Sequence, residues 1–381
     1  MNRHRDFIDW LLKSQESAEE SLEGVHDHFV HPAPSRQPRV DLRFQQIPQI
    51  LIWDDVPQPP EPNVQDYYEA GSPTSSTSTQ SSTQTFATQS SGIAASGHWA
   101  SAIFDKRPPE NRFHNNGGAT RCHGRVERGV VDKLHQHRFF EVAKFCFRAD
   151  NVTARFYWRP TDHRTRLLVS TTDLLGMEVR FCVLLTELKA VRQGNLLVLC
   201  RRDYRMDQVR GPLTVWAEFS FDVYEKLVLF YCIFAGMKNQ DWRSYPTILR
   251  DFYYKSQNVQ AQNEEVQLFS APIEDGGFSH FLRVYYDYDS RGSRLEARAR
   301  GGPMKSTPTW TAFITEQIQD ARWITKKGLR KVQLDGLHQY VFCDGYTPPK
   351  GRNEETILTF LDSGDADAFM GIIGNLRHIQ P

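Results

Sequence analysis

Short runs of aromatic and β-branched residues, each closed by a turn-forming residue, dominate the chain from about Arg125 onward. Segments such as FFEVAKFCF, VTARFYW and RTRLLVSTT alternate apolar with polar positions, and Gly, Pro, Asn or Asp separates the runs. Alternation with a period of two places successive side chains on opposite faces of a strand, and the short spacing between runs favours hairpins. The pattern therefore predicts an antiparallel β-meander.

One segment breaks the alternation, because eight consecutive apolar residues run from Leu227 to Phe234. Asp222 with Glu225 three positions later is typical of a helix start, and Gly236 is typical of a helix end. We predict one helix of roughly 14 residues here. Because this helix is apolar on nearly every side, it should be buried on more than one side, against the open end of the sheet.

The same order of elements then repeats. A second series of strand-like runs follows, and the chain closes with SGDADAFMGIIGNL. Ser363 or Asp365 can cap this last helix. Its apolar stripe comprises Phe369, Ile372, Ile373 and Leu376. The repeat predicts two modules, residues 119–241 (module 1) and 264–381 (module 2), joined by a connecting helix over residues 242–263.

The first 118 residues follow neither pattern. Residues 1–30 space apolar side chains as an amphipathic helix does, and residues 1–70 carry 13 acidic against 6 basic side chains. The helix would either pack on its own protein or dock on a partner. Residues 31–118 are rich in Pro and then in Ser, Thr and Gln, with too little apolar surface to offset the entropy of ordering. We predict a disordered linker there.

Composition says more about the compartment in which the protein resides than about its activity. The 46 Lys and Arg residues balance the 46 Asp and Glu residues, so no overall field favours a nucleic acid or a membrane. No apolar run approaches the roughly 20 residues that span a bilayer, and the N-terminus lacks the core of a signal peptide. The six cysteines are far apart, which indicates free thiols. We expect an intracellular protein, cytoplasmic or nuclear, with no transmembrane segment.

The order of strands and helix, together with FDVYEKLVLFYCIFAGMKNQD and TFLDSGDADAFMGIIGNL, resembles tandem pleckstrin-homology (PH)-like proteins of filamentous fungi. The resemblance covers about Arg125 to Arg377. It implies a mainly β fold, in which each module is an antiparallel seven-strand bent sheet or barrel closed by a C-terminal α-helix. The tryptophan common in that helix is absent here, and Tyr231 and Phe369 can take its packing role.

In the lipid-binding members of this fold, basic residues gather on the first two strands and their loop. Module 1 has four candidates near this hairpin: Lys144, Arg148, Arg155 and Arg159. Their spacing does not reproduce the basic triplet of the family. The matching hairpin of module 2 carries Glu274 and Asp275, which would repel phosphate. A phosphoinositide membrane surface is therefore a weaker alternative as partner.

Module 2 has its own basic stretches. Alternation along RGSRLEARARGG places Arg294, Arg298 and Arg300 on one strand face. The segment ITKKGLRK adds four cations around a turn: Lys326, Lys327, Arg330 and Lys331. These cations either form a solvated face that protects a sheet edge, or a patch that binds an acidic protein segment or a phosphate backbone.

No pattern of residues indicates catalysis. Five residues are of types that bind zinc: Cys122, His123, His135, His137 and Cys146. Their spacing lacks a paired C-x-x-C or H-x-x-x-H arm. A G-x-S-x-G elbow, a P-loop and an H-E-x-x-H sequence are absent as well. We expect no metal and no cofactor.

These observations favour a non-catalytic intracellular scaffold that binds a protein partner through its PH-like modules. Recognition would use an exposed sheet edge, an inter-strand loop or the basic face of module 2. A nucleic-acid- or histone-associated factor that uses the same basic face is the main alternative. A weak phosphoinositide binder and an enzyme without a recognisable motif are further alternatives.

Overall fold

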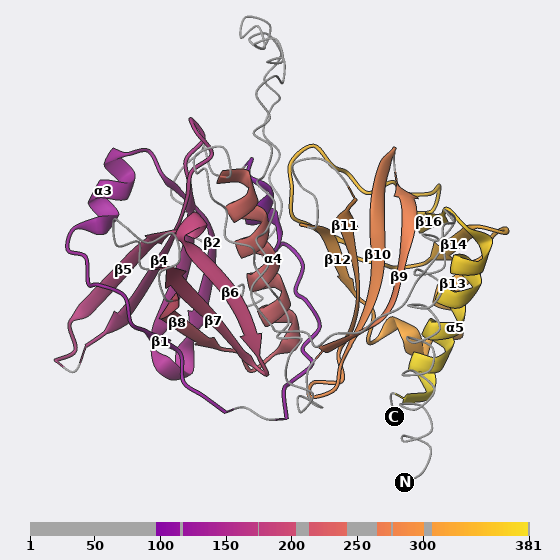
Figure 1. Ribbon diagram of the computed structural model, residues 1–381, viewed down its shortest axis with the longest axis horizontal. Coiled ribbons are helices and arrows are strands. Elements are labelled where there is room, and N and C mark those ends of the chain that lie inside the picture. Colours follow the sequence, from indigo (N-terminus) through magenta and orange to yellow (C-terminus); the bar gives the residue numbers. More distant parts are fainter. Residues whose placement is uncertain are drawn as a thin grey trace, which may run out of the picture. The chain divides into compact units, whose positions relative to one another are not determined.

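The structure, a computed structural model, describes residues 97–114, 117–173, 175–202, 213–241, 265–275, 277–300 and 307–379 (Figure 1). All of them fall within one compact unit, Thr88–Pro381. The predicted helix in residues 1–30 and the predicted connecting helix over residues 242–263 lie outside the described residues.

Module 1 contains the predicted meander as two four-stranded antiparallel sheets. The first has the order β2 (Phe140–Phe147), β3 (Val152–Trp158), β4 (Thr165–Thr172) and β5 (Glu178–Leu184). The second has the order β1 (Arg121–Cys122), β8 (Leu213–Ser220), β7 (Leu196–Arg202) and β6 (Leu188–Gln193). The turn η2 (Leu185–Glu187) joins the two sheets. Strands β2 to β8 are the seven predicted strands, and β1 is an addition.

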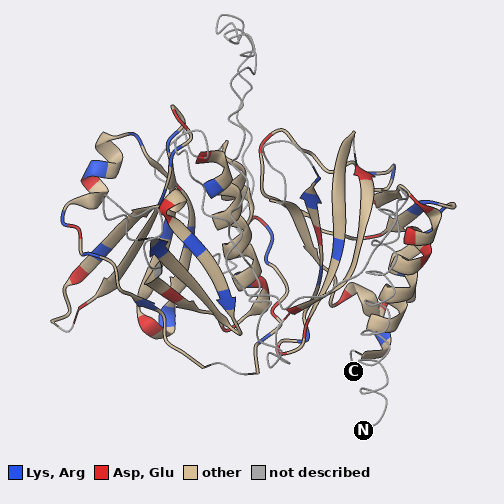
Figure 2. Cartoon of the chain, viewed as in Figure 1, with Lys and Arg blue, Asp and Glu red and all other residues tan. Residues whose placement is uncertain are grey.

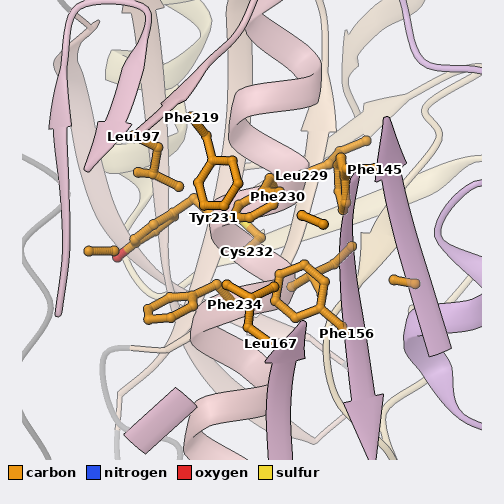
Figure 3. Close-up of a cluster of buried hydrophobic side chains, with 14 of the residues drawn as sticks. Phe145, Phe156, Leu167, Leu197, Phe219, Leu229, Phe230, Tyr231, Cys232 and Phe234 are labelled. Atoms are coloured by element: carbon orange, nitrogen blue, oxygen red, sulfur yellow. The ribbon is translucent and has the colours of Figure 1, made fainter. Parts of the chain in front are cut away.

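Helix α4 (Tyr224–Gln240) lies between these two sheets. The ring of Phe230 contacts the rings of Phe145, Phe156 and Phe219, which come from strands of both sheets (Figure 3). The helix is buried almost throughout its length, as its apolar sequence predicts.

The two ends of α4 differ from the prediction. Val223 precedes the first turn without a side-chain cap, and Glu225 is buried and accepts a hydrogen bond from the amide of Asn111 (2.9 Å). The helix also continues beyond Gly236 to Gln240. Gly236 serves close packing instead, because a Cβ there would lie 2.7 Å from the carbonyl oxygen of Phe342 in module 2.

Residues 97–114 are folded, although their composition predicts a disordered linker as far as residue 118. They include helix α2 (Trp99–Ala102), and Trp99, Ile103 and Phe113 join the core of module 1. The carbonyl of Asn111 also accepts from the first amide of α4. The prediction failed because the long Ser/Thr/Gln tract masks the change to the short apolar stretch HWASAIF.

A further helix covers the outer face of the first sheet. Helix α3 (Val130–Gln136) places Val130 and Leu134 in a small cluster with Tyr157 and Leu168. This cluster is separate from the core around α4, so that part of the sheet is buried on both faces.

Module 2 is a single eight-stranded antiparallel sheet with the order β13-β14-β16-β9-β10-β11-β12-β15. Its strands are β9 (Glu265–Asp275), β10 (Phe278–Asp287), β11 (Ser293–Ala299), β12 (Pro308–Phe313), β13 (Ile324–Lys326), β14 (Lys331–Leu334), β15 (Tyr340–Val341) and β16 (Thr356–Phe360). The short β15 is additional to the seven expected strands. Among the described strands, neither module closes into a barrel, which corrects that part of the expectation.

Helix α5 (Ser363–Ile379) covers the core of module 2. The ring of Phe369 lies against those of Phe269 and Phe360. The fully buried positions of the helix are Ala366, Phe369, Ile373 and Leu376, and Ile372 of the predicted stripe is partly buried. Two short turns, η4 (Gln317–Gln319) and η5 (Ala321–Trp323), precede β13.

Candidate partner-binding site

The basic face predicted on β11 is buried at its centre. Leu295 and Ala297 lie in the core of module 2, as the alternation predicts, but Arg294 on the opposite face is fully buried too. Its guanidinium donates to Glu265 (Nε–Oε1 2.6 Å) and to Glu296 (Nη1–Oε2 2.6 Å). Arg294 therefore cannot contact a partner, and its assignment to an exposed patch is wrong.

Residues of module 1 contribute to this buried cluster. Arg192 of β6 forms an ion pair with Asp287 of β10, and the Tyr224 hydroxyl of α4 donates to Glu265. Burial opposes ionisation of Glu265, yet the guanidinium of Arg294 holds its pKa below the usual range. The charges thus form a buried, mutually compensated network that links the two modules.

The other two arginines of β11 differ from each other. The side chain of Arg298 is 13% exposed and pairs with Glu296. Despite its burial, Glu296 has a pKa lowered to about 2 by Arg298 and Arg294. Arg300 is exposed, with its guanidinium 5.1 Å from the ring centre of Phe281. Of the three predicted arginines, Arg300 is the one open to a partner.

The β13–β14 hairpin exposes the second basic stretch. Lys327, Arg330 and Lys331 surround its turn and are exposed, and Lys326 forms an ion pair with Asp367 of α5. The turn also carries Leu329, which is 78% exposed. Three predicted cations and one large apolar side chain are therefore available at one turn.

Strand β13 is an edge strand, since within the described residues it pairs with β14 alone. The amide of Lys327, just after the strand, donates to the carbonyl of Lys331. Backbone groups face alternate sides along an antiparallel strand, so those of Ile324 and Lys326 face away from β14. These N–H and C=O groups are a template for an added strand.

Helix α5 runs beside this edge (Figure 1). Near its start Asp367 reaches Lys326, and near its end Arg377 donates to the carbonyl of Ile318 (2.8 Å), shortly before β13. Strand β13, its hairpin turn and the start of α5 therefore form one continuous border of module 2. We call it the β13 edge, residues 324–331 with Asp367.

In module 1, two of the four predicted basic residues are paired with carboxylates. Lys144 is exposed and lies opposite Arg155 across β2 and β3, but Arg155 is also 3.6 Å from Glu141. Arg159 donates to Asp162 (Nε–Oδ1 2.7 Å).

The hydrogen bond from Arg159 lowers the pKa of Asp162. Arg148 is exposed in the turn η1 (Arg148–Asp150) that follows β2.

Strand β6 is the counterpart of β13 in module 1, because each comes fifth in its module when the additional strand β1 is left out. It too ends a sheet. The carbonyl of Leu188, its first residue, accepts from the ammonium of Lys238 on α4 (2.6 Å), and Arg192 near its end is engaged with Asp287. The backbone at the start of this edge is therefore engaged by the protein itself, and the side chain near its end contacts module 2.

The described part of the chain gives little support for metal binding or catalysis. It contains no group of three or more His, Cys, Asp and Glu residues that could hold a metal ion. Burial raises the pKa of Cys122 to about 12, so this thiol is protonated at neutral pH. One pocket of about 290 Å³ lies beside Phe313, His338 and Tyr340, and its lining residues include no Ser, Thr or Cys. No described helix is long and apolar enough to cross a membrane.

Sequence reasoning missed the charges at the module junction. A signal existed for Arg192, because the alternation in LKAVRQ places it on the same face as Leu188 and Ala190, which are buried. No local pattern marks Glu265 or Asp287, since a buried carboxylate is revealed by partners that come from distant parts of the chain.

Two strand-rich modules, each ending in a helix that covers its sheet, define a tandem of PH-like domains. Residues 127–257 and 266–378 match two family models, each described as a PH domain found in tandem in fungal proteins. Together these matches cover more than half of the chain, and the protein belongs to this tandem PH-domain family. No curated protein and no solved structure matches the chain.

Proposed function

We propose that this protein is a non-catalytic scaffold that captures a protein partner on the β13 edge of module 2. PH-like domains commonly mediate protein or lipid binding. An extended segment of the partner would add to β13 as another strand, with main-chain hydrogen bonds to Ile324 and Lys326. The edge position of β13 carries this proposal, because within the described residues the strand pairs with β14 alone.

The contrast between the two modules supports the choice of edge. In module 1 the carbonyl of Leu188 in the matching strand β6 accepts from Lys238, and the side chain of Arg192 pairs with Asp287 of module 2. In module 2 the β13 edge exposes the cations Lys327, Arg330 and Lys331, which also discourage pairing with further copies of the same strand. We propose that module 1 holds module 2 in position and that module 2 binds the partner.

A nucleic-acid or histone partner is less well supported than a protein segment. Burial of Arg294 and near burial of Arg298 remove two cations from the face on which that alternative depends. For phosphoinositides, the pairing of Arg155 and Arg159 with carboxylates leaves less positive charge at the module 1 hairpin. All six cysteines are free thiols, which suits the proposed intracellular setting.

The experiment compares two substitutions at one residue of the full chain. Lys326→Pro removes an outward N–H that β14 does not use, whereas Lys326→Ala keeps it and removes the same side chain. We expect a protein captured from fungal extract to be retained by K326A and lost by K326P. Equal capture by both variants would contradict strand addition, and recovery of nucleic acid that disappears at high salt would favour the alternative partner.

A further inference from the structure

We infer that the segment captured at the β13 edge is acidic and carries an aliphatic side chain. This inference rests on the proposed function and adds the chemistry of the partner. It comes from the two kinds of side chain that the hairpin presents at its turn, cations and a leucine.

Positive charge gathers at the hairpin turn. Residues 324–334, ITKKGLRKVQL, contain four cations and no carboxylate. Within the described part of the chain, Lys327 and Lys331 form no ion pair. The guanidinium of Arg330 donates to the carbonyl of Leu361 (3.3 Å), a bond that leaves its charge uncompensated. Neighbouring cations raise the local potential and attract an oppositely charged segment.

The start of α5 carries charge of the opposite sign. Asp362, Asp365 and Asp367 lie in or near its first turn, where Figure 2 shows a group of acidic positions. Asp367 pairs with Lys326, and Asp362 accepts from the amide of Gly364 (2.6 Å). These carboxylates would repel acidic side chains on the helix side. The carboxylates of a bound segment therefore belong at the turn, against the free lysines.

Two exposed leucines lie beside the cations. Leu329 is 78% exposed and Leu361 is 37% exposed. The amide of Phe360 donates to the carbonyl of Arg330 (2.8 Å), which ties the hairpin turn to the end of β16, where Leu361 follows. Together they place apolar surface next to the cations of the turn. An aliphatic side chain of the segment would cover them.

An extended peptide fits the backbone groups, cations and leucines of this border better than a nucleic-acid duplex or a lipid bilayer does. The outward backbone groups of Ile324 and Lys326 require alternating donors and acceptors, which an extended peptide supplies. A phosphate surface supplies acceptors alone, and it would also meet the carboxylates at the start of α5.

The test uses the full chain and two short synthetic peptides, one alternating Glu with Val and the other Lys with Val. By fluorescence anisotropy at low salt, we expect the Glu-Val peptide to bind about tenfold more tightly, with the difference shrinking as salt is added. Lys327→Glu together with Lys331→Glu should abolish this preference. Lys144→Glu, which reverses an exposed lysine of module 1, should leave it unchanged, and Leu329→Ser should weaken Glu-Val binding several-fold.

Three results would overturn the inference. The first is binding of phosphatidylcholine/phosphatidylserine vesicles that needs Leu329 while neither peptide binds, which would make the hairpin a membrane contact. The second is loss of a captured cellular protein in K326P without any binding of the Glu-Val peptide; the proposed function would then stand and the acidic class would fail. The third is an equal loss of binding in K144E.

Discussion

The terminal helices α4 and α5 occupy equivalent places in their modules but differ in what surrounds them. Helix α4 lies between the two sheets of module 1 and also contacts β12 of module 2, with Phe313 and Phe342 in the same core cluster. Helix α5 buries one stripe, centred on Phe369 and Ile373, and exposes its other side.

This difference explains the eight apolar residues from Leu227 to Phe234. A helix that covers one sheet needs an apolar stripe, as α5 shows, whereas a helix covered by its own sheets and by a second module needs apolar residues all round. The apolar residues on every side of α4 therefore reflect its burial at the junction between the modules, and the amphipathic pattern of α5 matches a helix with one side exposed among the described residues.

The largest expected effect comes from breaking the buried charges at that junction. Arg294→Ala would leave Glu265 and Glu296 buried with less compensation, at a cost of about 3–5 kcal/mol in the free energy of unfolding. Arg300→Ala, at an exposed position just past the same strand, should change it by less than about 0.5 kcal/mol. Urea unfolding of the full chain measures both. Similar values for the two variants would mean that the buried network does not hold the modules together.

A smaller effect concerns the buried carboxylate at the start of α4. Burial raises the pKa of Glu225 to about 7, although hydrogen bonds from Asn111 oppose the shift. The unfolded chain loses this proton near pH 4.3. Between these values the folded state binds more protons, so stability from this group is full below the lower pKa and is lost as pH rises through about 7.

Glu225→Gln removes the titration and should flatten this part of the pH dependence. The measurement is the free energy of unfolding of both proteins from pH 5 to pH 8, read as a difference so that the histidines cancel. A difference that stays constant over this range would show that Glu225 is ionised throughout.

The packing of helices α4 and α5 can be compared directly at one glycine in each. A Cβ at Gly236 of α4 would lie 2.7 Å from the carbonyl oxygen of Phe342, whereas a Cβ at Gly371 of α5 meets nothing within 4 Å. Gly236→Ala should therefore destabilise by about 1–3 kcal/mol through overpacking. Gly371→Ala should stabilise by about 0.5–1 kcal/mol through helix propensity. Thermal unfolding distinguishes the signs, and stabilisation by both would mean that module 2 does not press on α4.

The smallest effect lies on the open border of α5. Asp367→Asn removes the partially exposed ion pair with Lys326, and exposed pairs of this kind contribute about 0.2–1 kcal/mol. We expect a correspondingly small loss of stability, together with tighter binding of the Glu-Val peptide, because Lys326 becomes available. Weaker peptide binding in this variant would indicate that Asp367 itself contacts the segment.

Much of the fold follows from local pattern. The alternation in FFEVAKFCF and its successors specifies strands β2 to β8, because half-buried strands of an antiparallel sheet need one apolar face. The outcome at β11 shows the limit of that reasoning. Its pattern correctly separates Leu295 from Arg294, but a strand pattern cannot tell whether its polar face meets water or another module.

The candidate site was predictable in part. The cations of ITKKGLRK and their placement around a turn are visible in the sequence. That β13 lies at the end of the sheet, and that β6 is engaged by Lys238, depends on pairing between distant segments. The same holds for Trp99, whose ring lies against that of Phe342, more than two hundred residues away in the chain.

The ion pair between Arg192 and Asp287 has a consequence for how this architecture can evolve. A gene rearrangement that moved module 2 elsewhere would leave Asp287 and Glu265 without Arg192 and Tyr224, while module 1 would keep an orphaned arginine and an apolar helix facing water. Neither module could therefore be moved to another protein without exposing or unpairing groups that the other module now covers. We expect the two to be inherited together, with substitutions on one side of the junction matched by substitutions on the other.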